Sequence, residues 1–324
     1  MSGTESTRGA GSLAHFPVSL VSSVMGLTGL AIAWQKAHRA FAVPAGVWMA
    51  VAALASAVFV VLIALYATKL LRFPEAVRGE WRHPVRVSFF PTISISLMLL
   101  ATVWADTAPS LAFPLWAGGA LLQLVFTLAI LSSWMFHTHY DIKHANPAWF
   151  IPVVGNLFVP IVGGRFASPE LGWFFFSVGI VFWVVLMTIV VYRVVFHDPV
   201  PLRLQPTLFI LLAPPAVGFV SYSALVPELD GFGRLLYYTA LFFALLLGCN
   251  ALRFVRGGFF ISAWAYSFPL AAVTIASFVM AQRSGNGFFL ALAGLFLTVV
   301  TLVVSLLVVK TLAAAWRNAI CVPE

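Results

Sequence analysis

The sequence predicts an all-α membrane protein with ten transmembrane helices, arranged as five helical hairpins. Of its 324 residues, 62% are hydrophobic and 9% are charged, whereas a soluble domain carries roughly 25% charged residues. The mean hydropathy is +1.01, because apolar runs of about 20 residues, the length that crosses the hydrocarbon core, recur along the chain. This composition excludes a soluble monomer.

Apolar runs bounded by charged residues, proline or glycine give the expected spans. In order along the chain they cover about 16–35, 44–68, 87–105, 112–136, 148–163, 171–192, 206–226, 232–252, 258–281 and 287–309. We therefore expect a single ten-helix transmembrane domain over 16–312, between a short tail over 1–15 and another over 313–324.

Lysine and arginine near the span ends predict the orientation. With ten spans both termini lie on one side, and if that side is the inside, thirteen of the eighteen basic residues lie on inner segments. The five outer ones are Lys36, Arg39, Arg165, Arg234 and Arg283. Both termini are thus predicted to be cytoplasmic, with the domain in a bacterial inner membrane. No basic run is interleaved with aromatic residues, so nucleic acid is not an expected partner.

Proline divides the predicted spans into two alternating classes. The odd-numbered spans contain the expected helix kinks, because proline removes a backbone donor, and the even-numbered spans are expected to be smooth helices without internal proline. The kink positions are Pro91, Pro152, Pro160, Pro214, Pro215 and Pro269. The spacing between leading prolines is close to one helical hairpin, which predicts five copies of a two-helix unit.

Small polar residues gather in the same odd-numbered spans, several of them at helical spacing on one face. Irregular backbone and polar stripes are tolerated in a membrane only against protein or a wet cavity. We therefore expect an inner ring of five kinked helices around a central pore and an outer ring of five. The alternative is that these residues only allow close helix packing. The expected pore-lining residues are Ser19, Ser22, Ser23, Gly26, Thr92, Ser96, Asn156, Gly218, Ser221, Ser267 and Thr274.

No ionisable residue is expected near the middle of a span, which disfavours proton-coupled transport and offers no convergent catalytic groups. The sequence favours passive conduction of small inorganic or organic anions, because basic residues at the cytoplasmic mouth of the pore would attract anions. A secondary carrier remains the alternative, and an enzyme is not expected.

Four segments carry a resemblance to a known family. They are HFPVSL at 15–20, HPVRVSFFP at 83–91, NPAWFIPVVG at 146–155 and WAYSFPL at 264–270. With these the chain resembles the tellurite-resistance and C4-dicarboxylate transporter family, which includes the plant slow-type anion channels. The resemblance implies an anion pore through each protomer, a homotrimer, and an aromatic gate at the position of Phe268. For a carrier it implies dicarboxylate, sulfite or tellurite-type oxyanions.

The segment HTHYDIKH contains three histidines and Asp141, a set that could bind a divalent metal. An interfacial loop holds such polar residues in any case, so we expect neither a metal nor another cofactor. The basic loop from Arg78 to Arg86 is expected to be solvated, with membrane lipid as the neighbouring partner.

Overall fold

The computed structural model describes residues 13–138, 140–256 and 258–321, and over these residues every regular element is a helix. The all-α prediction is confirmed. Within the described part of the chain, nine helical stretches are long and apolar enough to cross a membrane. They run over Val18–Phe41, Ala45–Arg72, Arg86–Trp104, Pro109–Phe136, Pro169–Phe196, Leu202–Leu225, Gly231–Cys249, Ile261–Ser284 and Gly287–Trp316.

Five segments begin as a 3₁₀-helix and continue as an α-helix, and we call them the compound segments. They are η1 (Val18–Val21) with α2 (Ser22–Phe41); η2 (Arg86–Phe89) with α5 (Thr92–Trp104); η4 (Pro147–Trp149), α7 (Phe150–Val154), η5 (Gly155–Phe158) and α8 (Val159–Gly163); η6 (Leu202–Leu212) with α10 (Ala213–Leu225); and η7 (Ile261–Tyr266) with α13 (Ser267–Ser284).

Five single α-helices alternate with the compound segments along the chain. They are α3 (Gly46–Arg72), α6 (Pro109–Phe136), α9 (Pro169–Phe196), α11 (Gly231–Cys249) and α14 (Gly287–Trp316). The shorter elements α4 (Pro74–Arg82), η3 (Ile142–His144) and α12 (Ala251–Arg256) lie in connections.

The expected kink prolines lie where one helix type gives way to the other or close to it. Pro91 directly precedes α5, Pro214 and Pro215 lie in the first turn of α10, and Pro269 lies in the first turn of α13. Proline suits a first helical turn, where its missing N–H has no helical acceptor. Pro152 lies inside the short helix α7, and Pro160 lies near the start of α8.

The structure refines the fifth expected span and corrects the fourth. The fifth span, 148–163, is present as the short apolar stretch Pro147–Gly163, which is divided into four pieces from η4 to α8 because proline and glycine recur every few residues in it. The fourth span does contain an internal proline. Helix α6 begins at Pro109, earlier than expected, and this places Pro114 in its second turn.

Burial separates the two classes of helix. In the most apolar stretch of each spanning compound segment, 61 to 83% of the residues are buried, whereas in the single helices the share is 22 to 33%. Large side chains such as Leu121, Val181 and Leu302 are exposed on the single helices. An exposed apolar surface of this extent fits a lipid environment, so the chain is a multi-pass membrane protein.

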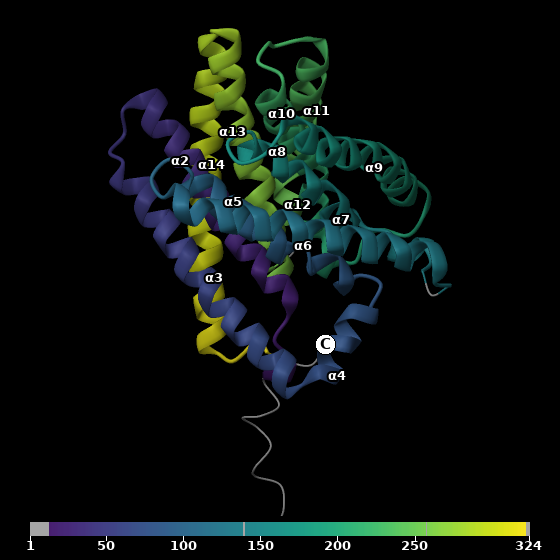
Figure 1. Ribbon diagram of the computed structural model, residues 1–324. Helices are drawn as coiled ribbons and strands as arrows, with labels where there is room; N and C mark the ends of the chain where they lie inside the picture. The colour runs from purple at the N-terminus through teal and green to yellow at the C-terminus, as the bar shows by residue number, and fades with distance from the viewer. Residues whose placement is uncertain (1–12, 139, 257, 322–324) are drawn as a thin grey trace, which may run out of the picture.

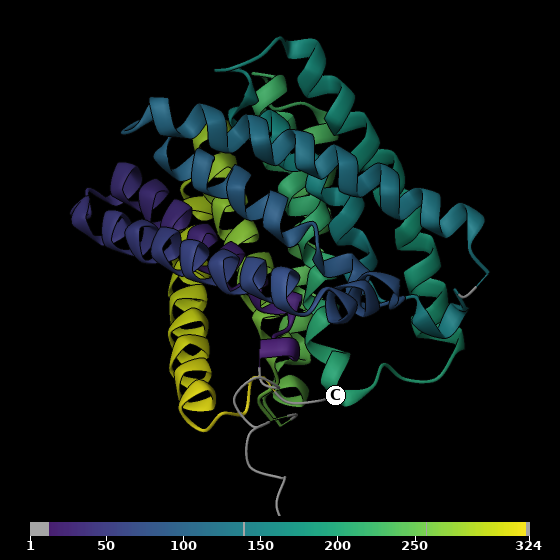
Figure 2. The same cartoon turned by 60° about the horizontal axis from the view of Figure 1, so that its bottom comes forward.

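Contacts between the compound segments follow a closed order. Helix α2 packs on α5, α5 on η5 and α8, α8 on α10, α10 on α13, and α13 on α2 again. Each compound segment also packs on the single helix that follows it, as α13 does on α14 and α2 on α3 (Figure 1). The turned view in Figure 2 shows α3, α6, α9 and α14 on the outside of this group.

A buried ion pair fixes the start of the first compound segment. The Lys69 ammonium lies 3.1 Å from the Glu80 carboxylate and donates to the Phe16 carbonyl at 2.7 Å. Glu80 also accepts from the Tyr66 hydroxyl at 2.8 Å. Lys69 and Glu80 are almost fully buried, so α3, α4 and the residue preceding Pro17 are held by one polar cluster.

We expect Lys69→Met to lower the free energy of unfolding by about 3–5 kcal/mol, because Glu80 would remain buried without its cation. Reversible denaturation of the purified protein in detergent micelles measures this loss. The matched control is Arg78→Met, which removes the exposed pair with Glu75 and should cost less than about 1 kcal/mol. Equal losses for the two variants would contradict a structural role for the buried pair.

Candidate functional site

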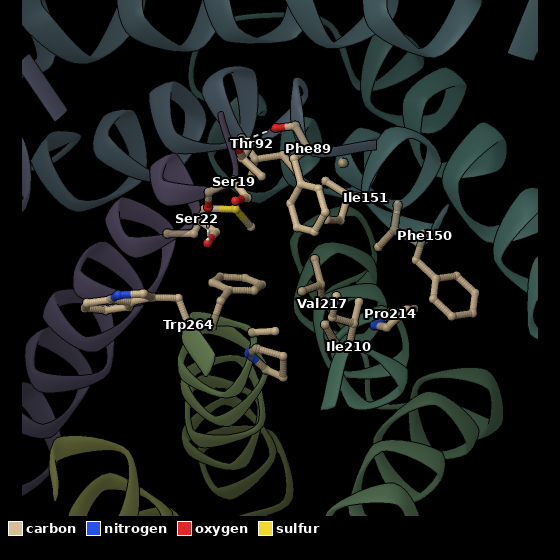
Figure 3. Close-up of a pocket in the computed structure, with 18 of the residues that line it drawn as sticks. Ser19, Ser22, Phe89, Thr92, Phe150, Ile151, Ile210, Pro214, Val217 and Trp264 are labelled. Carbon is tan, nitrogen blue, oxygen red and sulfur yellow. Dashed lines mark hydrogen bonds between the residues drawn. The ribbon is translucent and has the colours of Figure 1, made fainter. Parts of the chain in front are cut away.

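The five compound segments enclose a cavity that we call the aromatic cavity. Its wall takes residues from every compound segment, among them Ser19, Phe89, Phe150, Val217 and Trp264. Figure 3 shows the labelled side chains of Ser19, Ser22, Thr92, Val217 and Trp264 arranged around a common centre. The hydroxyls of Ser22 and Thr92 each donate to a carbonyl three residues earlier, at 2.6 Å. The wall is otherwise strongly apolar.

Two phenylalanine rings meet on this wall. Phe268 at the start of α13 and Phe158 at the end of η5 have ring centroids 5.3 Å apart, with their planes inclined by 52°. Gly29 of α2 lies against the same place, since a Cβ atom there would come within 3.3 Å of the Phe268 ring. Both rings are buried. Phe158 was not expected from the sequence, where one phenylalanine among thirty has no distinguishing signal.

A second cavity, of about 520 Å³, lies at the other end of the same segments, and we call it the basic cavity. Its wall contains Lys36, Arg39, Arg165, Arg283 and one carboxylate, that of Asp106. The aromatic cavity is lined by the beginnings of the compound segments and the basic cavity by their ends. The compound segments therefore run parallel to one another between the two cavities.

Asp106 joins two of the cations across the basic cavity. Its carboxylate pairs with Arg39 of α2 and with Arg165, which follows α8. Burial by itself would raise the pKa of Asp106, but the hydrogen bonds and charges of Arg165 and Arg39 hold it below its usual value. The carboxylate therefore stays ionised, and the two ion pairs weaken only as the pH falls through this lowered pKa.

Helical spacing identifies residues that lie between the two cavities. On α2, Met25 lines the aromatic cavity and Ile32 the basic cavity, so Thr28 falls on the same face between them. On α10 the residue between Val217 and Ala224 is Ser221 by the same spacing. Both hydroxyls are buried, and neither has a hydrogen-bond partner among the described residues.

The expected site residues fall into two groups. Those on the wall of the aromatic cavity are Ser19, Ser22, Thr92, Pro214, Phe268 and Pro269. The wall does not include Ser23, Gly26, Ser96, Asn156, Gly218, Ser221, Ser267 and Thr274, or the prolines Pro91, Pro152, Pro160 and Pro215. Gly26 and Ser267 lie against each other where α2 crosses α13, since a Cβ atom on Gly26 would overlap the Ser267 side chain. Gly218 lies close to Ile180 of α9.

Asn156 belongs to a buried polar network that supports the broken fifth segment. The carbonyl of Pro152 accepts hydrogen bonds from Gln123 at 2.8 Å and from Thr127 at 2.7 Å. Asn156 donates to Thr127 at 2.9 Å, and Ser94 donates to Gln123 at 2.7 Å. Gln123 and Thr127 lie on α6, a span that was expected to be smooth and apolar. They were therefore not identified from the sequence as functional or structural polar residues.

The histidine segment forms a local turn in the structure. The His144 ring accepts from the backbone N–H of Asp141 at 3.1 Å, and Lys143 pairs with Asp141 at 3.2 Å. His139 lies outside the described residues. Among the residues that the structure describes, no three His, Cys, Asp or Glu side chains are grouped as metal ligands.

A family model described as voltage-dependent anion channel matches residues 15–312. The chain belongs to the voltage-dependent anion channel family. The resemblance found in the sequence is thereby confirmed, and the matched residues include all five compound segments. This family consists of channels and transporters rather than enzymes.

The relatives of the chain in this family include plant and bacterial proteins. S-type anion channel SLAH3 of Arabidopsis thaliana is 28% identical over 317 residues, which cover 94% of this chain and 49% of the plant protein. Guard cell S-type anion channel SLAC1 of the same plant is 25% identical over 321 residues, covering 94% and 57%. Tellurite resistance protein TehA homolog of Haemophilus influenzae is 29% identical over 263 residues, covering 79% of each chain.

The chain thus spans about half the length of these plant relatives. Together they support anion transport in general.

We expect Gln123→Leu to lower the free energy of unfolding by about 1–3 kcal/mol, because the Pro152 carbonyl loses a donor and the Ser94 hydroxyl an acceptor. The measurement is denaturation in detergent micelles. Ser132→Ala, at an exposed position of α6, is the control and should change little. A double-mutant cycle with Ser94→Ala should give a coupling energy of about 0.5 kcal/mol or more, and strictly additive losses would show that the two side chains do not interact.

Proposed function

We propose that this protein is a passive anion channel, or a channel-like exporter, for small inorganic or organic anions, with a pore through each protomer. The observation that carries the proposal is the alignment of the two cavities. The same five parallel segments surround both, and the paired rings of Phe158 and Phe268 lie on the wall of the aromatic cavity. Membership of an anion channel family supports the same function.

The proposed pore has an inner ring of five helices and an outer ring of five, so the fifth compound segment must cross the membrane. It spans 17 residues over Pro147–Gly163. Seven of these are in 3₁₀ conformation, with a rise of about 2.0 Å each, and ten are α-helical, at about 1.5 Å each. Laid end to end on one axis, the four pieces would extend about 29 Å, close to the roughly 30 Å of a hydrocarbon core. Conversion to 3₁₀-helix lets a short segment cross.

Passive conduction fits the chemistry of the aromatic cavity. Among the described residues of its wall there is no Asp, Glu, Lys, Arg or His, whereas a proton-coupled pump places ionisable relays in its pathway. The polar side-chain groups present are the hydroxyls of Ser19, Ser22, Thr92 and Ser262 and the indole N–H of Trp264. The compound segments begin at this end of the bundle, so their dipoles add partial positive charge, which favours anions.

Phe268 is the proposed gate. A ring in a narrow apolar passage excludes water, and an ion must give up hydration to pass such a constriction. Phe158 packs against Phe268 and is proposed to help close the passage. In this proposal, opening involves rotation of the Phe268 ring away from Phe158.

The second candidate is a secondary carrier or exporter for dicarboxylate, sulfite or tellurite-type oxyanions. The relative named as a tellurite resistance protein favours it. A carrier would show a turnover that saturates with substrate and a reversal potential that follows a coupling ion, whereas a channel follows the anion gradient alone. We further propose a homotrimer in a bacterial inner membrane, in contact with lipid, as the family resemblance implies.

We expect Phe268→Ala to raise anion conductance in reconstituted bilayers about tenfold or more, because the ring no longer closes the passage. The matched control is Phe278→Ala. It removes a buried ring from the same helix α13, where Phe278 packs on Phe41 away from both cavities. If the assembled Phe268→Ala variant conducts no better than the parent or the control, the gate is not at Phe268.

We expect a reporter enzyme that is active only in the periplasm to remain inactive when it is fused after Glu324, because the proposed orientation puts thirteen of the eighteen basic residues on the same side as that end. A fusion within the loop that follows α2, after Val43, should be active and serves as the control. Strong activity of the C-terminal fusion would overturn the proposed topology.

A further inference from the structure

The basic cavity holds four of the five basic residues that the charge count places on the outer side, namely Lys36, Arg39, Arg165 and Arg283. Most basic residues are predicted to lie on the inner side, and the few on the outer side would be expected to be spread over the outer loops. Instead they line one cavity of about 520 Å³, together with a single carboxylate. Such a gathering needs an explanation that topology does not supply.

Three of these cations already have partners. Arg39 and Arg165 pair with Asp106, and Arg283 donates to the Ser223 carbonyl at 2.6 Å. Partial negative charge at the ends of α2 and α13 also stabilises the cations Arg39 and Arg283, which lie in the last turns of those helices. Structural roles therefore account for Arg39, Arg165 and Arg283.

Lys36 is different. It lies before the last turn of α2, its side chain is half-buried on the cavity wall, and across the described chain no hydrogen bond or ion pair holds its ammonium group. An ammonium that is partly removed from water is stabilised by a partner of opposite charge. The other charged residues on the wall are three arginines and Asp106, and Asp106 is already shared by two of those arginines. An anion in the cavity would supply the missing partner.

We propose that the basic cavity is a binding site for a small dianion, such as a doubly charged oxyanion, with Lys36 as the residue that holds it. Four cations and one carboxylate leave three positive charges on the wall. One monovalent ion would leave two of these uncompensated, so a dianion is favoured. The inference rests on the proposed function, since it assigns an anion-binding chamber to the end of the pore opposite the aromatic cavity.

The experiment measures equilibrium binding of radiolabelled sulfate to the purified, full-length protein in detergent, at constant ionic strength. Sulfate should bind, chloride should compete only at much higher concentration, and Lys36→Gln should weaken binding about tenfold or more through loss of a charge-assisted hydrogen bond. The matched control is Lys310→Gln, at an exposed position of α14 remote from the cavity, which should bind sulfate like the parent.

A second variant tests the charge argument in the opposite direction. Asp106→Asn releases Arg39 and Arg165 and leaves four positive charges, so sulfate should bind more tightly than to the parent. Sulfate binding that is absent, unaffected by Lys36→Gln, or equalled by chloride would overturn the proposal. Because this measurement requires no ion to cross the protein, it stands or fails independently of the conductance of Phe268→Ala.

Discussion

The structure depends on one constraint, which is that every backbone carbonyl freed inside the membrane must find a donor from the protein or from water in a cavity. The fifth compound segment frees several, since it changes helix type three times over Pro147–Gly163. Helix α6 supplies the donors. Gln123 and Thr127 reach the Pro152 carbonyl, and the Trp116 indole donates to the Val159 carbonyl at 2.9 Å.

These three donors lie at intervals of seven and four residues, on one face of α6. The largely apolar helix α6 thus supports the fifth compound segment in its broken form. The close fit includes Gly155, where a Cβ atom would overlap the Gln123 amide. The shape of the fifth compound segment therefore depends on its contacts with α6.

The sequence alone predicted the helical class and most span boundaries to within a few residues. An apolar run of membrane length is compatible with few structures other than a transmembrane helix. It also identified the proline positions that lie at or near changes of helix type. It could not show Gln123 or Thr127 as network residues, since a single glutamine in a run such as ALLQLVF carries no signal about the carbonyl it meets. That contact joins residues 29 positions apart.

The same limit applies to the candidate site. Ser19, Ser22 and Thr92 line the aromatic cavity, but Gly26 and Ser267 have the same small size and spacing and lie between two helices instead. Helical periodicity shows which residues share one face of a helix. It does not show whether that face lines a cavity or packs on another helix. For the basic cavity, the charge count treated Lys36 and Arg165 as loop residues, and only the folded chain brings them onto one wall.

The parallel direction of the five compound segments has a consequence for ion flow. Each segment begins at the aromatic cavity and ends at the basic one, so the two ends of the proposed pore differ in chemistry and in the sign of the helix dipoles. An anion arriving from one side meets hydroxyls and aromatic rings first, and from the other it meets fixed cations. We expect such a pore to rectify, that is, to carry unequal currents at equal and opposite voltages, because the cations and helix ends at one mouth differ from the uncharged wall at the other.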